Sequence, residues 1–136
     1  MRGKDYLMNS HQKVVFMAIM LVLTVAFVTS AAGIKKRIKF PKGFSGVTLK
    51  GGVIRGDRDV YLLKAGKGQT MKVTITSTEN NAVFQIYAPN TRALKGADET
   101  DDAMKWKGKL PLAGDYQIVV GGTRGNASYS ITVEVE

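Results

Sequence analysis

Beyond residue 33, hydrophobic and polar side chains alternate with a period of two, which is typical of β-strands with one buried face. The alternation is strict in the stretch 71–76 (MKVTIT), where apolar side chains are separated by lysine and threonine. The stretches 116–120 and 129–135 repeat it on either side of a glycine-rich turn. These three segments therefore predict strands that each direct one face towards a common core.

Further strands are predicted where apolar residues are bounded by glycine, proline or asparagine. Residues 90–104, in contrast, form the longest polar segment without strand character. About eight short strands with turns between them predict an all-β domain, which we interpret as a single antiparallel β-sandwich. Besides the three strands above, the expected strands are 37–40, 47–53 with a bulge or bend at Gly51-Gly52, a buried strand at 57–64, 84–87 and 105–108.

The turn between the last two strands carries a single arginine. Gly121-Gly122 and Gly125-Asn126 flank Arg124 and supply residues that readily adopt positive φ. The turn is therefore expected to close a hairpin. A slip of one residue in this hairpin would turn its apolar face to solvent, so the turn also fixes the register.

The first 32 residues differ from the rest. Residues 14–28 (VVFMAIMLVLTVAFV) form an apolar run that follows a basic start and precedes small residues, which is the arrangement of a secretory signal peptide. We expect cleavage after Ala32, so that residues 33–136 form one exported domain, periplasmic or secreted. The alternative is an uncleaved membrane anchor, and the protein would then meet a membrane through this segment alone.

The charge of the chain favours an acidic partner. The formal charge is +9, and residues 33–136 keep all but three of the 20 basic residues and all but one of the 11 acidic residues, which leaves +7. Such a surface favours anionic glycans or lipids, whereas export argues against nucleic acid. The basic stretch IKKRIKFPKG (34–43) is interpreted as a solubility tail.

Few side chains in the predicted domain are suited to catalysis. The only histidine is His11 and there is no cysteine, so residues 33–136 lack the groups for Ser-His-Asp or Cys-His catalysis and for zinc sites built on nitrogen and sulfur. The acidic loop 98–102 leaves a carboxylate glycosidase or a calcium site as alternatives to a solvated loop, which is the interpretation we favour. Trp106 is interpreted as a core residue, with sugar stacking as its alternative. We therefore expect a binding protein without enzyme activity, cofactor or metal.

Several motifs together resemble a known family. They are SGVTLKGGVIRGDRDVYLLKAGKGQTMKVTITS (45–77), FQIYAP (84–89), WKGKLPLAGDYQIVV (106–120), and an arginine-bearing turn followed by YSITVEV (129–135). With these motifs the chain resembles the periplasmic lysozyme inhibitors of the i-type and g-type classes. It is also similar to the bacterial pre-peptidase C-terminal β-sandwich modules, which share the order of a Gly-Gln turn, a strand, Leu-Pro and Gly-Asp-Tyr.

The resemblance implies an exported bacterial β-sandwich that inhibits a g-type or i-type lysozyme by inserting a loop into its glycan cleft. An arginine suits contact with the catalytic carboxylates there, because its planar fork binds a carboxylate through two hydrogen bonds. The turn in this chain is shorter than that of the family and lacks its second arginine. The different-class alternative is a non-enzymatic glycan- or envelope-binding accessory module. The candidate partner contacts are Arg124, Asn126, Ser128 and Tyr129, with Ser45 and Gly46 as weaker candidates.

Overall fold

Eight β-strands make up the regular structure of residues 33–136, the part of the chain that this computed structural model describes. The predicted signal peptide, residues 1–32, lies outside the described residues. Among residues 33–136 no helix has the length and apolar character needed to cross a bilayer. The strands are β1 (Lys35–Arg37), β2 (Gly46–Val53), β3 (Asp59–Ala65), β4 (Thr70–Ser77), β5 (Ala82–Tyr87), β6 (Lys105–Lys109), β7 (Gly114–Gly122) and β8 (Ala127–Val135).

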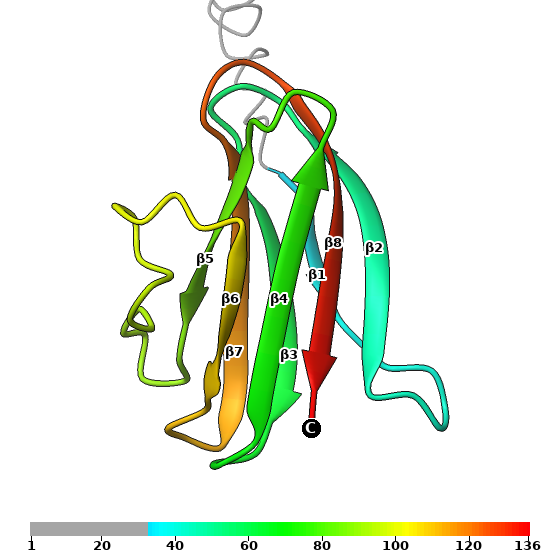
Figure 1. Cartoon of the computed structure of the whole chain (residues 1–136), viewed down its shortest axis with the longest axis vertical. Helices are drawn as coiled ribbons and strands as arrows, with labels where there is room; N and C mark the ends of the chain where they lie inside the picture. Colours follow the sequence, from blue (N-terminus) through cyan, green and yellow to red (C-terminus); the bar gives the residue numbers. More distant parts are fainter. Residues whose placement is uncertain (1–32) are drawn as a thin grey trace, which may run out of the picture. The chain divides into compact units, whose positions relative to one another are not determined.

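The strands form two four-stranded sheets that make a sandwich (Figure 1). One sheet has the order β1-β3-β7-β5 and the other has the order β2-β8-β4-β6. Neighbouring strands run antiparallel except β1 and β3, which run parallel. The predicted all-β sandwich of about eight strands is confirmed, and the parallel pair is its one departure from the antiparallel prediction.

The core lies between the sheets and follows from the alternation in the sequence. Met71, Val73 and Ile75 of β4 are buried, and the register with β8 places Val133 beside Val73 and Ile131 beside Ile75. Burying an aliphatic side chain of this size contributes about 1.5–3 kcal/mol. The chain has no cysteine, so the packing of this core stabilises the domain without the help of disulfides.

The first strand differs in its bounds from the predicted strand 37–40. β1 begins two residues earlier because backbone groups on both sides of it are held by β3 and its leading loop. The N–H of Ile34 donates to Oδ1 of Asp59 at 3.0 Å, and the N–H of Ile38 donates to the carbonyl of Leu62 at 2.8 Å. All three residues of β1 are exposed, so no alternation of buried side chains marks the strand in the sequence.

The residue before β1 packs closely against the loop that leads into β3. A Cβ atom at Gly33 would overlap the carbonyl oxygen of Arg58. Any other residue at position 33 would therefore force the backbone apart, so glycine allows the chain to enter the sheet here.

The expected bulge or bend at Gly51-Gly52 is wrong. β2 stays in continuous register with β8 from Gly46 to Val53, and Gly51 lies opposite Tyr129. A Cβ at Gly51 would overlap the phenol of Tyr129. Gly51 therefore leaves room for the ring of Tyr129 and does not interrupt the strand.

Segment 88–104 covers one side of the sandwich between β5 and β6 (Figure 1), and it contains no strand, as was predicted for residues 90–104. Two isolated bridges to β5 hold it, Phe84 with Ala103 and Tyr87 with Ala93. Trp106 of β6 packs against the core and donates its indole N–H to the carbonyl of Lys95 at 2.9 Å. The tryptophan thus fastens this segment to the sheet edge.

Candidate functional site: an arginine-bearing end of the sandwich

Three loops meet at one end of the sandwich, uppermost in Figure 1. They are residues 54–58 between β2 and β3, residues 78–81 between β4 and β5, and residues 123–126 between β7 and β8. We call this the arginine end, because it carries three exposed arginines, Arg55, Arg58 and Arg124.

Arg124 lies exposed in the turn between β7 and β8. The predicted hairpin is wrong, because β7 pairs with β3 and β5 in one sheet and β8 pairs with β2 and β4 in the other, so this turn joins the two sheets. Nη2 of Arg124 donates to the carbonyl oxygen of Glu79 at 2.8 Å. A guanidinium has five N–H donors, so this single bond leaves other donors of Arg124 for a carboxylate on a partner. The backbone contact orients the side chain without neutralising its charge.

Buried Asn81 holds the Arg124 turn in place. Its Nδ2 donates to the carbonyl oxygens of Arg124 at 3.0 Å and of Asn126 at 2.9 Å, and its own carbonyl accepts from the N–H of Thr123 at 2.9 Å. Its backbone N–H in turn donates to Oγ of Ser77. Asn81 is only 2% exposed, so these bonds form away from solvent and fix the turn before any partner binds.

Asn126 joins the Arg124 turn to the neighbouring loop. Its Oδ1 accepts from the backbone N–H of Arg55 at 2.9 Å. The exposed Arg55 side chain therefore belongs to the same end as Arg124, although the two residues are far apart in the sequence. Asn126 and exposed Ser128 also line a hollow of about 140 Å³, together with Thr78, Glu79 and Asn81.

Arg58 lies across the end of β7 rather than beside Arg124. Its Nη1 donates to the carbonyl of Asp57 at 2.9 Å. A Cβ at Gly121 would overlap the guanidinium, so the glycine predicted as a turn residue also makes room for this arginine. Arg58 therefore adds positive charge to the arginine end, with its guanidinium lying against the backbone of β7 at Gly121.

Tyr129 does not lie on the surface. It is 4% exposed, and its hydroxyl is hydrogen-bonded to Oδ2 of Asp59 and to the hydroxyl of Tyr61, each at 2.6 Å. Burial raises the pKa of Tyr129 well above its ordinary value, and the bond to Asp59 raises it further. Tyr129 therefore anchors β8 in the core next to Ser128, and its side chain is not available to a partner.

Ser45 and Gly46 lie at the opposite end of β2 from Arg55. The register pairs Gly46 with Glu134, whereas the end of β2 near Arg55 pairs with the start of β8. Ser45 and Gly46 line a separate hollow of about 330 Å³ beside exposed Phe44. The structure thus brings Arg124, Asn126 and Ser128 together and leaves these two weaker candidates apart.

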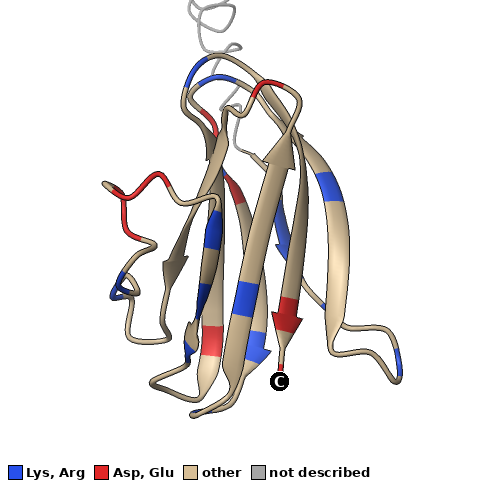
Figure 2. Ribbon diagram, in the orientation of Figure 1, with Lys and Arg blue, Asp and Glu red and all other residues tan. Residues whose placement is uncertain are grey.

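The acidic loop 98–102 lies on segment 88–104 (Figure 2). Oδ1 of Asp98 accepts from the backbone N–H and the hydroxyl of Thr100, and these bonds hold the pKa of Asp98 below its usual range. Oδ2 of Asp101 accepts from the N–H of Asp98. These two carboxylates are thus engaged within the loop. Among residues 33–136 no group of three or more acidic side chains is placed to hold a metal ion.

The sequence pattern located the Arg124 turn but missed Asn81 and Arg55. Asn81 is one of two asparagines in a polar turn, and nothing in the sequence distinguishes it from exposed Asn80. Arg55 lies in the loop after β2, where no periodic pattern assigns a role. A pairing of β2 with β8 would have brought Arg55 to the Arg124 turn, but strand order cannot be read from alternation alone.

Comparison with known proteins identifies relatives of this sandwich, although no family model matches the chain. The inhibitor of g-type lysozyme from Escherichia coli (strain K12) is 27% identical over 132 residues, covering 85% of this chain and 93% of that protein. The crystal structure of PliG from Aeromonas hydrophila, a periplasmic inhibitor of g-type lysozyme, is 30% identical with a TM-score of 0.66, covering 78% of this chain and 100% of that one.

A more distant structure shares the fold alone. The pre-peptidase C-terminal domain of a collagenase from Bacillus anthracis is 16% identical with a TM-score of 0.55, and the match covers 75% of this chain and 96% of that one. The layout of strands and turns is thus common to both groups that the motifs resemble.

Proposed function

Because the chain belongs to the family of periplasmic inhibitors of g-type lysozyme, we propose that it inhibits a g-type lysozyme by placing the arginine end in the glycan cleft of the enzyme. The protein acts by binding and is not an enzyme. A periplasmic location agrees with the predicted signal peptide.

The proposal depends on one observation above all, the fixed presentation of Arg124. The turn is held by Asn81 through bonds to Arg124 and Asn126, so little conformational entropy is lost when it enters a cleft. Glycoside hydrolysis commonly uses carboxyl groups that flank the scissile bond. A guanidinium that reaches such a carboxylate forms a charge-assisted pair in a site from which water is excluded.

Arg55 supplies a second cation to the same contact. Its backbone is joined to Asn126, and within residues 33–136 the only salt bridge is between Arg37 and Asp115, so no carboxylate of the described domain pairs with Arg55 or Arg124. Two neighbouring cations favour a cleft that carries negative charge. Asn126 and Ser128 border the contact with an amide and a hydroxyl, which suit the polar rim of an interface.

Lysis of cell walls by a g-type lysozyme tests this proposal. The full-length chain is expressed with export, and the purified protein is added to the enzyme at stoichiometric amounts. We expect inhibition, and we expect Arg124→Ala to weaken it by about 30-fold or more, the effect of a hot-spot residue worth at least ~2 kcal/mol. Arg55→Ala should weaken it to a smaller extent, because its side chain lies at the border of the turn.

Arg92→Ala is the matched control, because it removes the same charge from an exposed position on segment 88–104. Equal inhibition by the Arg124 and Arg92 variants would refute insertion of the arginine end while leaving inhibition itself standing. An i-type lysozyme in parallel reactions measures the selectivity for the g-type class. Lack of inhibition of either enzyme by the unaltered protein would refute the function.

A further inference from the structure

The outer face of sheet β2-β8-β4-β6 is polar throughout. Residues of each strand that share this face alternate with the buried core residues, and the antiparallel register places them side by side. We call it the hydroxyl face, because serine and threonine occupy its centre on β8 and β4. Its residues are Gly46, Thr48, Lys50 and Gly52 of β2, Ser128, Ser130, Thr132 and Glu134 of β8, Thr70, Lys72, Thr74 and Thr76 of β4, and Lys105, Lys107 and Lys109 of β6.

Lysines border this face along its β6 edge (Figure 2). Lys105, Lys107 and Lys109 are exposed, and alternate residues of a strand lie about 7 Å apart. Lys72 lies directly opposite Lys107 in the register. Glu134 is the single acidic residue on the face, and none of these lysines forms a salt bridge within residues 33–136.

The face is shaped into shallow hollows rather than being smooth. A hollow of about 410 Å³ lies over β2, β8 and the end of β4, lined by Lys50, Thr76, Ser128 and Ser130 among others. A second hollow of about 190 Å³ lies between β4 and β6 and is lined by lysines 72, 105 and 107 together with Val73, Thr74 and Trp106. The first hollow is thus bordered mainly by hydroxyls, and the second by lysines around an apolar floor.

We propose that the hydroxyl face binds a linear glycan that carries carboxylate groups, namely the peptidoglycan of the cell wall. Serine and threonine hydroxyls both donate and accept hydrogen bonds, as sugar hydroxyls do. Lysine ammonium groups pair with the carboxylates of the polymer. The choice of peptidoglycan as the source of this chemistry rests on the periplasmic location in the proposed function.

The composition of the face favours a glycan over a bilayer. A protein that lies on a membrane usually buries aromatic or aliphatic side chains below the headgroups. No strand residue of the hydroxyl face has an apolar side chain, and exposed Phe44 borders the face in a hollow that Thr48, Thr132 and Glu134 also line. The face also differs from the arginine end, since it presents strand residues rather than loops, so a glycan and a lysozyme contact different side chains apart from Ser128 at the border.

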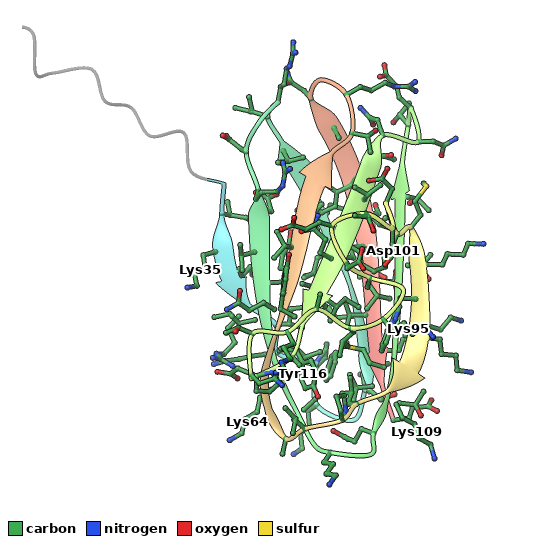
Figure 3. All side chains as sticks on the ribbon, turned by 90° about the vertical axis from the view of Figure 1, so that its left-hand side faces the viewer. Lys35, Lys64, Lys95, Asp101, Lys109 and Tyr116 are labelled. Atoms are coloured by element: carbon green, nitrogen blue, oxygen red, sulfur yellow. The ribbon has the colours of Figure 1, made fainter. Side chains whose placement is uncertain are left out.

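Co-sedimentation with insoluble peptidoglycan sacculi tests this proposal, using protein exported from the full-length chain. The variant K105Q/K107Q/K109Q removes three charges from the face. K35Q/K36Q/K39Q removes three exposed lysines from and just after β1, at an edge of the other sheet, and is the matched control. Figure 3 shows Lys109 and Lys35 on opposite sides of the molecule.

We expect the β6 variant to bind sacculi about tenfold or more weakly, as for the loss of three exposed ion pairs. The control should bind as the unaltered protein does, and binding should fall with added salt because exposed pairs are screened. An equal loss of binding in the two variants would show an unspecific charge effect and would refute the hydroxyl face as the binding site. Absence of binding to sacculi would also refute it.

Two further measurements distinguish glycan binding from strand-edge association and from membrane binding. Lys72→Gln alters an interior strand, so weaker binding by this variant supports the face independently of any role of the β6 lysines in preventing edge-to-edge association. Preferential binding to vesicles of phosphatidylglycerol and phosphatidylcholine over sacculi would refute the glycan in favour of a membrane. The β6 variant should inhibit lysozyme acting on a soluble chitin oligosaccharide as well as the unaltered protein does. Failure of the glycan-binding proposal can therefore be told apart from failure of the proposed function.

Discussion

Asp59 is a buried carboxylate that is satisfied by neutral donors. It is 2% exposed, and it accepts hydrogen bonds from the Tyr129 hydroxyl and the backbone N–H of Ile34. Tyr61 completes the group through its bond to Tyr129. A buried acceptor that loses its hydrogen-bond donor still carries the cost of desolvation. Removal of one hydroxyl from this group is therefore expected to destabilise the fold by leaving the remaining polar groups without partners.

Tyr129→Phe should lower the free energy of unfolding by about 1–3 kcal/mol, because it leaves Oδ2 of Asp59 and the Tyr61 hydroxyl without a partner. Urea denaturation at pH 7 measures this change. Inhibition of lysozyme should persist at temperatures where the variant stays folded. Loss of inhibition with unchanged stability would instead make Tyr129 a partner contact and contradict its placement here.

The same variant should respond differently to alkali. Burial raises the pKa values of Tyr129 and Tyr61 above their ordinary value. Their contribution is therefore complete below the unfolded pKa of about 10 and is lost as the pH rises through the folded values. Unfolding experiments above pH 10 should show a steeper loss of stability in the unaltered protein than in Tyr129→Phe.

Among the elements, β1 depends most on contacts outside its own sequence. Arg37 reaches across β3 and forms a two-bond pair with Asp115 of β7, at 2.8 and 2.9 Å. This hydrogen-bonded pair holds the pKa of Asp115 below its usual range. Both side chains are about half exposed, so the pair guides β1 into place more than it stabilises the whole domain.

Asp115→Asn should loosen β1 at neutral pH. Hydrogen exchange of the Ile38 amide, which is bonded to Leu62, measures the effect, and protection should be lower in the variant. Because the folded pKa of Asp115 is lowered, its contribution is present above the unfolded pKa of about 3.9 and is lost as the pH falls through the folded value. The difference between the two proteins should therefore vanish in acid. A difference that persists there would contradict an ionic origin.

Alternation located most elements but gave neither their order nor their tertiary contacts. β4, β7 and β8 were predicted because each buries every second residue against the opposite sheet. β1 has no buried residue and was displaced by two residues. The Arg124 turn could be found from its glycines, whereas the roles of Asn81 and Arg55 depend on loops that meet only after β2 and β8 have paired.

For the whole molecule, the distribution of charge matters more than its sum. Basic residues outnumber acidic ones by seven in residues 33–136, but acidic side chains gather on segment 88–104 (Figure 2). The β6 edge is basic, and the arginine end carries three exposed arginines against Asp57 and Glu79 in the same loops. We expect an enzyme with an acidic cleft to be oriented towards these arginines, and this steering should weaken as ionic strength rises.

Export should yield a protein that begins at Gly33. The small residues before this position match the preference of signal peptidase, and the eight strands lie entirely beyond it. Mass spectrometry of the periplasmic fraction measures the N-terminal residue. Recovery of the intact chain with the membrane fraction would contradict cleavage and favour the anchor.

The close packing of Gly33 on the carbonyl of Arg58 sets an order of events in biogenesis. Proteases act on extended, unpacked chain, and the bond expected to be cut adjoins this residue directly. We therefore expect cleavage after Ala32 to come before β1 docks on β3. The other seven strands should then pair first, and β1 should join the sandwich last.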